Sequence, residues 1–161
     1  MAQIDVGILE AIDIAMEAEM KAQQFYADAA KRVINVRGRN LLEQLADFEQ
    51  NHYNKLKALK DALTSSGEYI KYEGTEFKPF KSEVTGTLES DKAGVLDVLK
   101  IAIDAEIKAK DHYTKMAEAT NDPEGKAMFE KLADEEDFHR RILNDEFYNL
   151  SNEGGTWSWG D

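Results

Sequence analysis

The chain has 161 residues, 42% of them hydrophobic, a size that suits one globular domain with a single core. Its net charge of −12 disfavours binding to nucleic acid or anionic membranes, and the lack of cysteine excludes disulfides, thiolate metal sites and iron–sulfur clusters. The N-terminal residues lack the basic and apolar regions of a signal peptide, and no apolar run reaches membrane-spanning length, so we expect a soluble cytoplasmic protein.

Four amphipathic helices are predicted, at about 5–33, 39–63, 92–116 and 123–150. Asp5 and Asp91 are suitable N-caps for the first and third helices, and Asp122-Pro123 places a cap before a proline at the first position of the fourth. Each helix carries a stripe at steps of three and four residues, which is typical of a helix bundle. The predicted core residues are Ile8, Ile12, Ala15, Ala22, Tyr26, Ala29, Val33, Leu42, Leu45, Leu56, Leu59, Leu63, Val95, Leu99, Ala102, Ala109, Tyr113, Met116, Phe129, Leu132, Leu143 and Leu150.

Short connections join the first helix to the second and the third to the fourth, so each pair is predicted to form an antiparallel hairpin. The segment between the hairpins contains glycines, Pro79 and aromatic residues such as Tyr69 and Tyr72. Because a long structureless loop is unusual in a compact domain, we predict a crossover that runs the length of the bundle.

The predicted domain spans 1–150, with hairpins at about 5–63 and 92–150 and the crossover at 64–91. The C-terminal tail, 151–161, is rich in glycine but holds both tryptophans of the chain. Since exposure of two tryptophans is costly, docking of this tail on a partner subunit is favoured over a frayed end.

The two hairpins carry the same pattern 87 positions apart, with no insertion between 7–63 and 94–150. The repeat includes two glutamates, one tyrosine and one histidine in each copy, and several small or basic residues. Glu19, Tyr26, Glu49 and His52 recur as Glu106, Tyr113, Glu136 and His139, and Ala15, Ala18, Lys21 and Ala22 recur as Ala102, Ala105, Lys108 and Ala109. We infer that a helical hairpin has been duplicated.

Six of the repeated residues occupy stripe positions where a bundle normally buries leucine: Glu19, Glu49, His52, Glu106, Glu136 and His139. Burial of four carboxylates together is strongly unfavourable through desolvation and repulsion, and two divalent cations would neutralise them. In each Glu-x-x-His the side chains share one helix face, roughly 4.5 Å apart along the axis, so they can bind one metal or let the glutamate bridge two. Carboxylate and imidazole ligands suit iron or manganese and tolerate zinc. The alternative is a set of polar core residues that satisfy one another.

One glutamate plus Glu-x-x-His, twice over four helices, resembles the ferritin-like di-iron carboxylate bundle. Within that superfamily the chain is similar to the di-iron domain of rubrerythrins, through the tyrosine seven residues after Glu19 and the repeated Leu-Ala-x-x-Glu-x-x-His. The resemblance implies an all-α, ferritin-like antiparallel four-helix bundle that holds two iron ions. It also implies that Glu19 and Glu106 are terminal ligands, Glu49 and Glu136 bridge the metals, and His52 and His139 bind one metal each.

The chain departs from the rubrerythrin pattern in three respects. Rubrerythrins usually have a second glutamate one turn from the position of Glu106, where this chain has Ile103 and Ala109. The chain carries no rubredoxin domain. Many di-iron proteins have an aspartate before each bridging glutamate as a partner for histidine, and here those positions hold Phe48 and Glu135.

Tyrosines follow the glutamates of the first and third helices by two turns. Because helical side chains lean toward the N-terminus, Tyr26 and Tyr113 are expected to reach back to a ligand carboxylate, the alternative being simple core aromatics. Ala22 and Ala109, between each glutamate and its tyrosine, would leave room for peroxide or dioxygen.

Other polar residues near these motifs are assigned outside the ligand set. His112 aligns with Phe25, off the stripe, and is expected at the surface. Glu135 competes with Glu136 as a ligand, but the repeat selects Glu136.

The resemblance implies a di-iron oxidoreductase that reduces hydrogen peroxide, with one electron from each of two ferrous ions. An external donor such as a rubredoxin or flavoprotein would restore the electrons, and a homodimer is expected. The first alternative is a ferroxidase that uses dioxygen, although Gln50 stands where bacterioferritins have a haem-binding methionine. The others are a di-iron hydroxylase and a metal-stabilised bundle without turnover.

Overall fold

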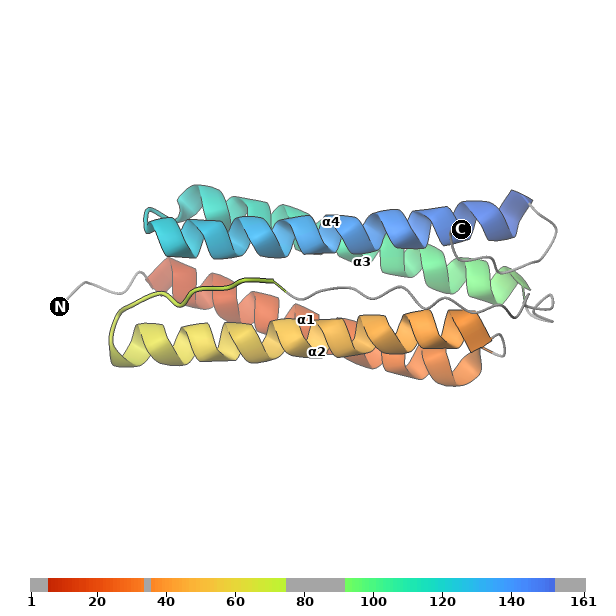
Figure 1. The fold of residues 1–161 in the computed structure, drawn as a ribbon, viewed down its shortest axis with the longest axis horizontal. Helices are drawn as coiled ribbons and strands as arrows, with labels where there is room; N and C mark the ends of the chain where they lie inside the picture. The colour runs from red at the N-terminus through yellow and green to blue at the C-terminus, as the bar shows by residue number, and fades with distance from the viewer. Residues whose placement is uncertain (1–5, 34–35, 75–91, 153–161) are drawn as a thin grey trace.

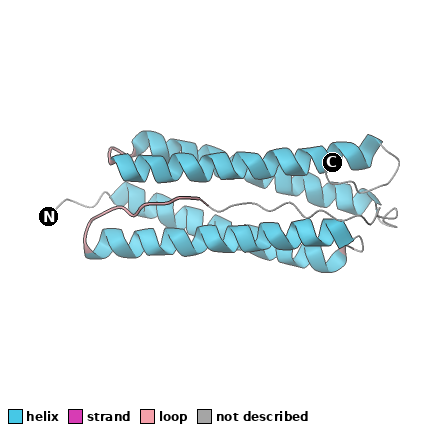
Figure 2. Cartoon of the chain, in the orientation of Figure 1, coloured by secondary structure: helices cyan, strands magenta, loops and turns pink. Residues whose placement is uncertain are grey.

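The structure, a computed structural model, describes residues 6–33, 36–74 and 92–152. It contains the helices α1 (Val6–Arg32), α2 (Val36–Ser65), α3 (Lys92–Ala119) and α4 (Pro123–Asn152). These ranges hold no strand, as Figure 2 shows. The predicted all-α four-helix bundle is therefore confirmed.

The bundle consists of two helical hairpins laid against each other (Figure 1). The α1–α2 and α3–α4 interfaces are extensive, whereas α1 meets α3 along a smaller interface. Tyr26 on α1 bonds to Glu106 on α3, and Tyr113 bonds to Glu19, so α1 and α3 run antiparallel. The two hairpins are thus related by an approximate two-fold axis, as expected for a duplicated sequence.

The start of α4 follows the predicted cap. The Asp122 side chain accepts hydrogen bonds from the N–H groups of Glu124 at 2.9 Å and Gly125 at 3.0 Å, and Pro123 holds the first helical position. The predicted caps Asp5 and Asp91 lie outside the described residues. The second helix begins at Val36, before the predicted start near 39, because apolar periodicity marks the buried part of a helix and not its full extent.

The apolar core is divided into two clusters, one toward each end of the bundle. Most of the predicted stripe is buried, for example Ile12, Leu45 and Leu99 at 0% exposure. Ala22 and Ala109 are the exceptions, since both are partly exposed. The six glutamates and histidines of the repeat lie between the two clusters.

The described part of the crossover, residues 66–74, folds back along the bundle from the end of α2 (Figure 1). Gly67 has a φ of 76° and donates its N–H to the Ala62 carbonyl at 3.1 Å, which ends α2. The Tyr69 ring then packs on Phe129, with ring centroids 6.4 Å apart. Residues 64–65 of the predicted crossover belong to α2, and residues 151–152 of the predicted tail belong to α4. The rest of the crossover (75–91) and the rest of the tail (153–161), which holds both tryptophans, lie outside the described residues. None of the described helices combines the length and the apolar character that a membrane span requires.

Candidate metal centre

The six predicted residues meet at the centre of the bundle, and every helix contributes to them. Glu19 comes from α1, Glu106 from α3, and the two Glu-x-x-His pairs come from α2 and α4. All six side chains are buried, with exposures between 0% and 2%. The stripe positions predicted from the sequence therefore converge in space, and they bring together four carboxylates and two imidazoles.

The cluster forms two overlapping groups, each with the spacing of a metal-binding site. Glu19, Glu49, His52 and Glu136 offer ligand atoms within 4.8 Å of one another, and Glu49, Glu106, Glu136 and His139 do the same. Glu49 and Glu136 belong to both groups. They are therefore placed to bridge two cations, while Glu19 and Glu106 face one position each.

Both histidines turn their Nδ1 atoms toward the carboxylates. His52 Nδ1 lies 3.1 Å from Glu136 Oε1 and 3.4 Å from Glu19 Oε2. His139 Nδ1 lies 3.2 Å from Glu49 Oε1 and 3.7 Å from Glu106 Oε1. The two rings stack with centroids 6.2 Å apart, so each imidazole faces a different half of the cluster.

A cation fits this donor set, because several buried carboxylate oxygens face the imidazoles and one another without making a hydrogen bond. In the described structure Glu19 Oε2, Glu49 Oε1, Glu106 Oε2, Glu136 Oε1 and His52 Nδ1 make no hydrogen bond. Buried polar groups are normally paired, and buried charges are normally neutralised by a partner or a metal. One unsatisfied oxygen on each of four carboxylates is the arrangement that two divalent cations would satisfy.

Without metal, three groups of the cluster hold their protons to higher pH than the same groups do in water. Burial raises the pKa of Glu49 and of Glu136 well above the usual 4.5, and neighbouring carboxylates raise both further. Burial acts the other way on the pKa of His52, but the charge of Glu19 prevails and lifts it well above 6.5. Burial also opposes ionisation of Glu19, yet the nearby His52 lowers the pKa of that carboxyl below its usual value. A metal would displace the protons that Glu49, Glu136 and His52 hold.

These shifts predict opposite pH responses of the metal-free and metal-loaded protein. Because the pKa values of Glu49, Glu136 and His52 are raised in the folded protein, protonation of these groups stabilises the fold at low pH. This stabilisation is lost as the pH rises from about 4.5 upward through the raised pKa values. We expect the Tm of the metal-free protein to fall between about pH 5 and pH 8, and that of the loaded protein to rise, because metals compete with protons. Thermal unfolding with chelator and with metal measures both slopes. A metal-free Tm that increased over this range would contradict the shifts, and Glu49→Gln should flatten the slope.

Glu135, which the sequence set aside in favour of Glu136, contacts the cluster from outside. It is 9% exposed, and its Oε1 lies 3.2 Å from His52 Nε2. Tyr72, from the crossover, donates its hydroxyl hydrogen to the same carboxylate oxygen. In the neutral imidazole, an Nε2–H bond from His52 to Glu135 would leave Nδ1 without a proton and aimed at the cluster, which is the tautomer a metal requires.

The two tyrosines bond across the hairpins. Tyr26 donates to Glu106 at 2.6 Å, and Tyr113 donates to Glu19 at 2.6 Å. Seven residues along a helix span roughly 10 Å, so each phenol is far from the glutamate of its own helix and opposite that of the antiparallel helix. Burial raises the pKa of both phenols, and the neighbouring carboxylates raise it further, so both stay protonated as donors.

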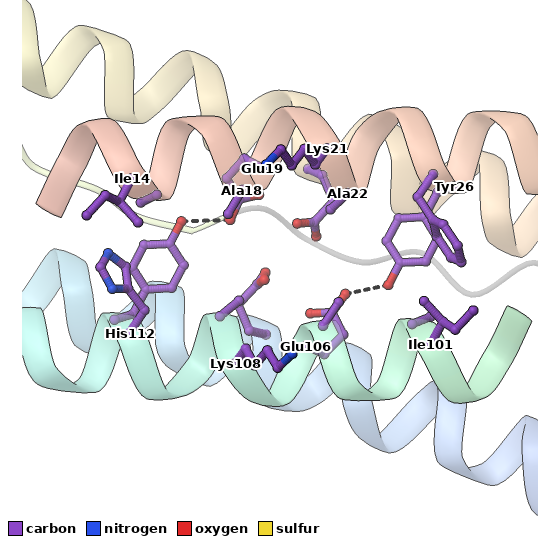
Figure 3. A pocket seen from close by; sticks show the side chains of 18 residues that line it. Ile14, Ala18, Glu19, Lys21, Ala22, Tyr26, Ile101, Glu106, Lys108 and His112 are labelled. Atoms are coloured by element: carbon purple, nitrogen blue, oxygen red, sulfur yellow. Dashed lines mark hydrogen bonds between the residues drawn. The ribbon is translucent and has the colours of Figure 1, made fainter.

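A cavity of about 450 Å³ lies between α1 and α3 and reaches the carboxylates. Ala22 and Ala109 line it, which explains their partial exposure. Figure 3 shows the Tyr26–Glu106 bond beside the cavity and His112 at its other end.

The surface position predicted for His112 is wrong. The ring is partly buried and donates its Nε2–H to the Ala11 carbonyl at 3.0 Å, because α1 packs over this part of α3.

Comparisons with known proteins agree with this geometry. The family model described as Rubrerythrin matches residues 2–60 and 75–154, a region that includes all six residues of the cluster. The solved structure of a hypothetical protein from Pyrococcus furiosus is 26% identical to the chain, with a TM-score of 0.73 over 91% of this chain and 91% of that one. No curated protein is significantly similar to the chain.

Proposed function

Since the chain belongs to the rubrerythrin family, we propose that its buried cluster binds two iron ions and that the protein reduces hydrogen peroxide with electrons from a separate donor. Glu19 and Glu106 would be terminal ligands, Glu49 and Glu136 would bridge the ions, and His52 and His139 would bind one ion each. When bound, the two ferrous ions supply one electron each, which together reduce one peroxide molecule to water.

The observation that carries the proposal is the overlap of the two groups at Glu49 and Glu136. Two isolated sites would each need their own carboxylates, whereas shared glutamates hold two cations close together. Such a pair can deliver two electrons to one oxidant. The all-oxygen and nitrogen donor set suits iron, and manganese or zinc can substitute for it.

The residues around the cluster support this chemistry in distinct ways. The hydroxyl hydrogens of Tyr26 and Tyr113 lie beside the cavity and can be shared with an oxygen that leaves with negative charge. The cavity gives a small oxidant a route to the carboxylates from the α1–α3 face. Glu135 orients His52, because its carboxylate contacts the ring nitrogen Nε2 while Nδ1 faces the cluster.

The 161 residues contain no cysteine, the ligand that an iron–sulfur cluster or rubredoxin-type iron requires, which supports a separate electron donor. We propose that a one-electron donor protein of the rubredoxin or flavoprotein class restores the ferrous state. We also propose a homodimer, on the basis of the family resemblance.

The test is rapid mixing of anaerobic, ferrous-loaded protein with hydrogen peroxide or with dioxygen, followed by near-ultraviolet charge-transfer absorption. We expect oxidation of about two irons per chain, faster with peroxide than with dioxygen. A faster reaction with dioxygen would replace the proposal with ferroxidase chemistry. Absence of absorption with either oxidant would reject redox function and favour a metal-stabilised bundle.

The tyrosine pair should affect rate more than metal content. We expect Tyr26→Phe combined with Tyr113→Phe to retain two irons while the peroxide reaction slows by about 100-fold, the usual effect of losing a positioned proton donor. Iron analysis and the same rapid-mixing assay measure the two quantities. Tyr53→Phe, on α2 outside the cavity lining, is the matched control. An unchanged rate in the double variant would remove the tyrosines from the mechanism.

A further inference from the structure

The cavity between α1 and α3 is larger than the proposed oxidant requires. Its volume is about 450 Å³. A water molecule takes up roughly 30 Å³, so hydrogen peroxide or dioxygen would fill only a small part of it. An apolar cavity of about 150 Å³ holds a benzene-sized molecule, and small-molecule pockets start at about 300 Å³. The space therefore has the size of a site for an organic molecule.

The cavity walls are mostly apolar and come from both halves of the duplication. Apolar wall residues include Ile14, Ala18 and Ala22 on α1 and their repeats Ile101, Ala105 and Ala109 on α3, and Lys21 and Lys108 also line the cavity. Ile14 and Ile101 are 59% and 56% exposed and lie at opposite ends of the cavity (Figure 3). Exposed apolar side chains around a hollow mark a binding site for an apolar group.

The polar end of the cavity is the proposed metal centre. Glu19 and Glu106 lie at its inner wall with the two tyrosine hydroxyls bonded to them. A molecule that fills the cavity must therefore have an apolar body outside and a reactive polar group inside. For a site that reduces peroxides, the class with both properties is an organic hydroperoxide.

We propose that the cavity binds the apolar part of an organic hydroperoxide, ROOH, and directs its O–O group to the cluster; this inference rests on the proposed function. In the step the O–O bond breaks, and ROOH, two protons and two electrons give the alcohol ROH and one water molecule. The electrons come from two ferrous ions, which become ferric and are restored by the one-electron donor protein. The small side chains of Ala18 and Ala105 make room for the group R.

The kinetic test compares cumene hydroperoxide with hydrogen peroxide on ferrous-loaded protein. We expect cumene hydroperoxide to react at lower concentration than hydrogen peroxide, and Ala18→Leu or Ala105→Leu to lower the ratio of the two rate constants by at least about tenfold. Ala58→Leu, on the exposed side of α2, is the matched control and should leave the ratio unchanged.

A binding test avoids dependence on turnover. The product alcohol, 2-phenyl-2-propanol, is titrated into zinc-loaded full-length protein, which is redox-inert. We expect saturable binding that Ala18→Leu and Ala105→Leu weaken by at least about tenfold and Ala58→Leu does not.

The outcomes separate the substrate class from the function itself. Fast oxidation by hydrogen peroxide alone, with no binding of the alcohol, would overturn the inference and leave peroxide reduction intact. No oxidation by either peroxide would reject both. If the leucine variants change the oligomeric state in sedimentation instead of alcohol binding, the face is an interface between copies of this chain and the inference is wrong.

A second inference rests on separate contacts, those of Tyr72. The crossover approaches α4 closely at two glycines. A side chain at Gly125 would come within 2.5 Å of the Tyr69 ring, and one at Gly74, whose φ is 89°, within 2.5 Å of Lys131 Cε. These close approaches hold the segment between them against α4, and Tyr72 lies in that segment.

Tyr72 reaches the cluster through Glu135 and His52, and the other hairpin has a different arrangement. Position 48, the repeat of 135, is Phe48, whose ring packs edge-on against His139 with centroids 4.5 Å apart. We infer that Tyr72 is a positioning residue for the cation at His52, because its hydroxyl bonds to the carboxylate that contacts this imidazole.

The test is calorimetric titration of zinc into the metal-free full chain. We expect Tyr72→Phe, which keeps the ring and removes the hydroxyl, to weaken one of two binding events by about 10- to 100-fold and leave the other unchanged. Glu135→Gln should weaken the same event, and the double variant should lose no more than the stronger single one, because both act through His52. Tyr148→Phe, 66% exposed on α4, is the control.

Either of two results would overturn the positioning role. Unchanged zinc affinities in Tyr72→Phe would show that the hydroxyl contributes nothing to the centre. Equal weakening of both binding events would show that the crossover acts only through general packing of the bundle. A wild-type chain that binds no zinc would reject the proposed metal centre together with this inference.

Discussion

Glu136→Gln is expected to lose metal while the metal-free protein becomes more stable. Glu136 belongs to both groups of the cluster, so the amide removes one bridging charge from both proposed cations. We expect zinc or ferrous affinity to fall by at least about 100-fold, beyond the loss typical of an outer partner. Without metal, Gln removes a carboxyl whose pKa is raised by burial and then by Glu106 and Glu19, so unfolding at neutral pH should require more heat.

The Glu136→Gln variant is informative because it should weaken metal binding and at the same time stabilise the metal-free protein. A glutamate that only packed or bonded in the core would, when replaced, destabilise the metal-free protein and leave metal binding intact. The measurements are metal titration and Tm with and without chelator. Glu130→Gln, an exposed position on the same helix, is the control and should change neither quantity. Metal affinity equal to that of the wild type would reject the ligand assignment of Glu136.

Ferrous iron is expected to raise the Tm of the metal-free protein by a large amount. A site at a free metal concentration 1,000 times its Kd contributes about 4.1 kcal/mol, so two sites would shift Tm on the order of 20 °C in a chain of this size. The effect is large because the metals also remove the repulsion among four buried carboxylates. Anaerobic thermal unfolding before and after iron loading measures the shift.

Chelation provides the control for that measurement. Removal of iron should return the Tm to its starting value if the centre is reversible. His52→Leu replaces a ligand by an apolar side chain, so we expect a smaller metal-dependent shift in this variant because one proposed ion loses its imidazole. A wild-type Tm that is the same with and without iron would argue against a structural contribution of the centre.

Much of the fold was predictable because the helical period and the burial of one helix face produce a recognisable pattern of apolar residues in the sequence. Steps of three and four residues placed the four helices, and Asp122-Pro123 located the start of α4 to the residue. The cluster was predictable for a related reason. Glutamate and histidine at leucine positions of a bundle stripe are so unfavourable alone that they must meet one another, and the duplication identified which residues do so.

The contacts around the cluster were harder to predict from the sequence. Each tyrosine was expected to reach back toward a carboxylate, yet the partner lies on the other hairpin, because the choice depends on how α1 and α3 align. The same alignment buries part of His112, which repeat comparison alone had placed at the surface. Pairing between hairpins is a property of their docking, and helical period carries no information about it.

The sequence by itself determined the four helices, their grouping into two hairpins and the six residues that meet in the core, since these follow from local periodicity and from the cost of buried charge. Only the tertiary structure decided that Tyr72 bonds to Glu135 beside His52, and that a cavity opens over Glu19 and Glu106. The crossover has no repeating period to predict its path. The cavity depends on the separation of α1 and α3, which the packing of the whole bundle sets.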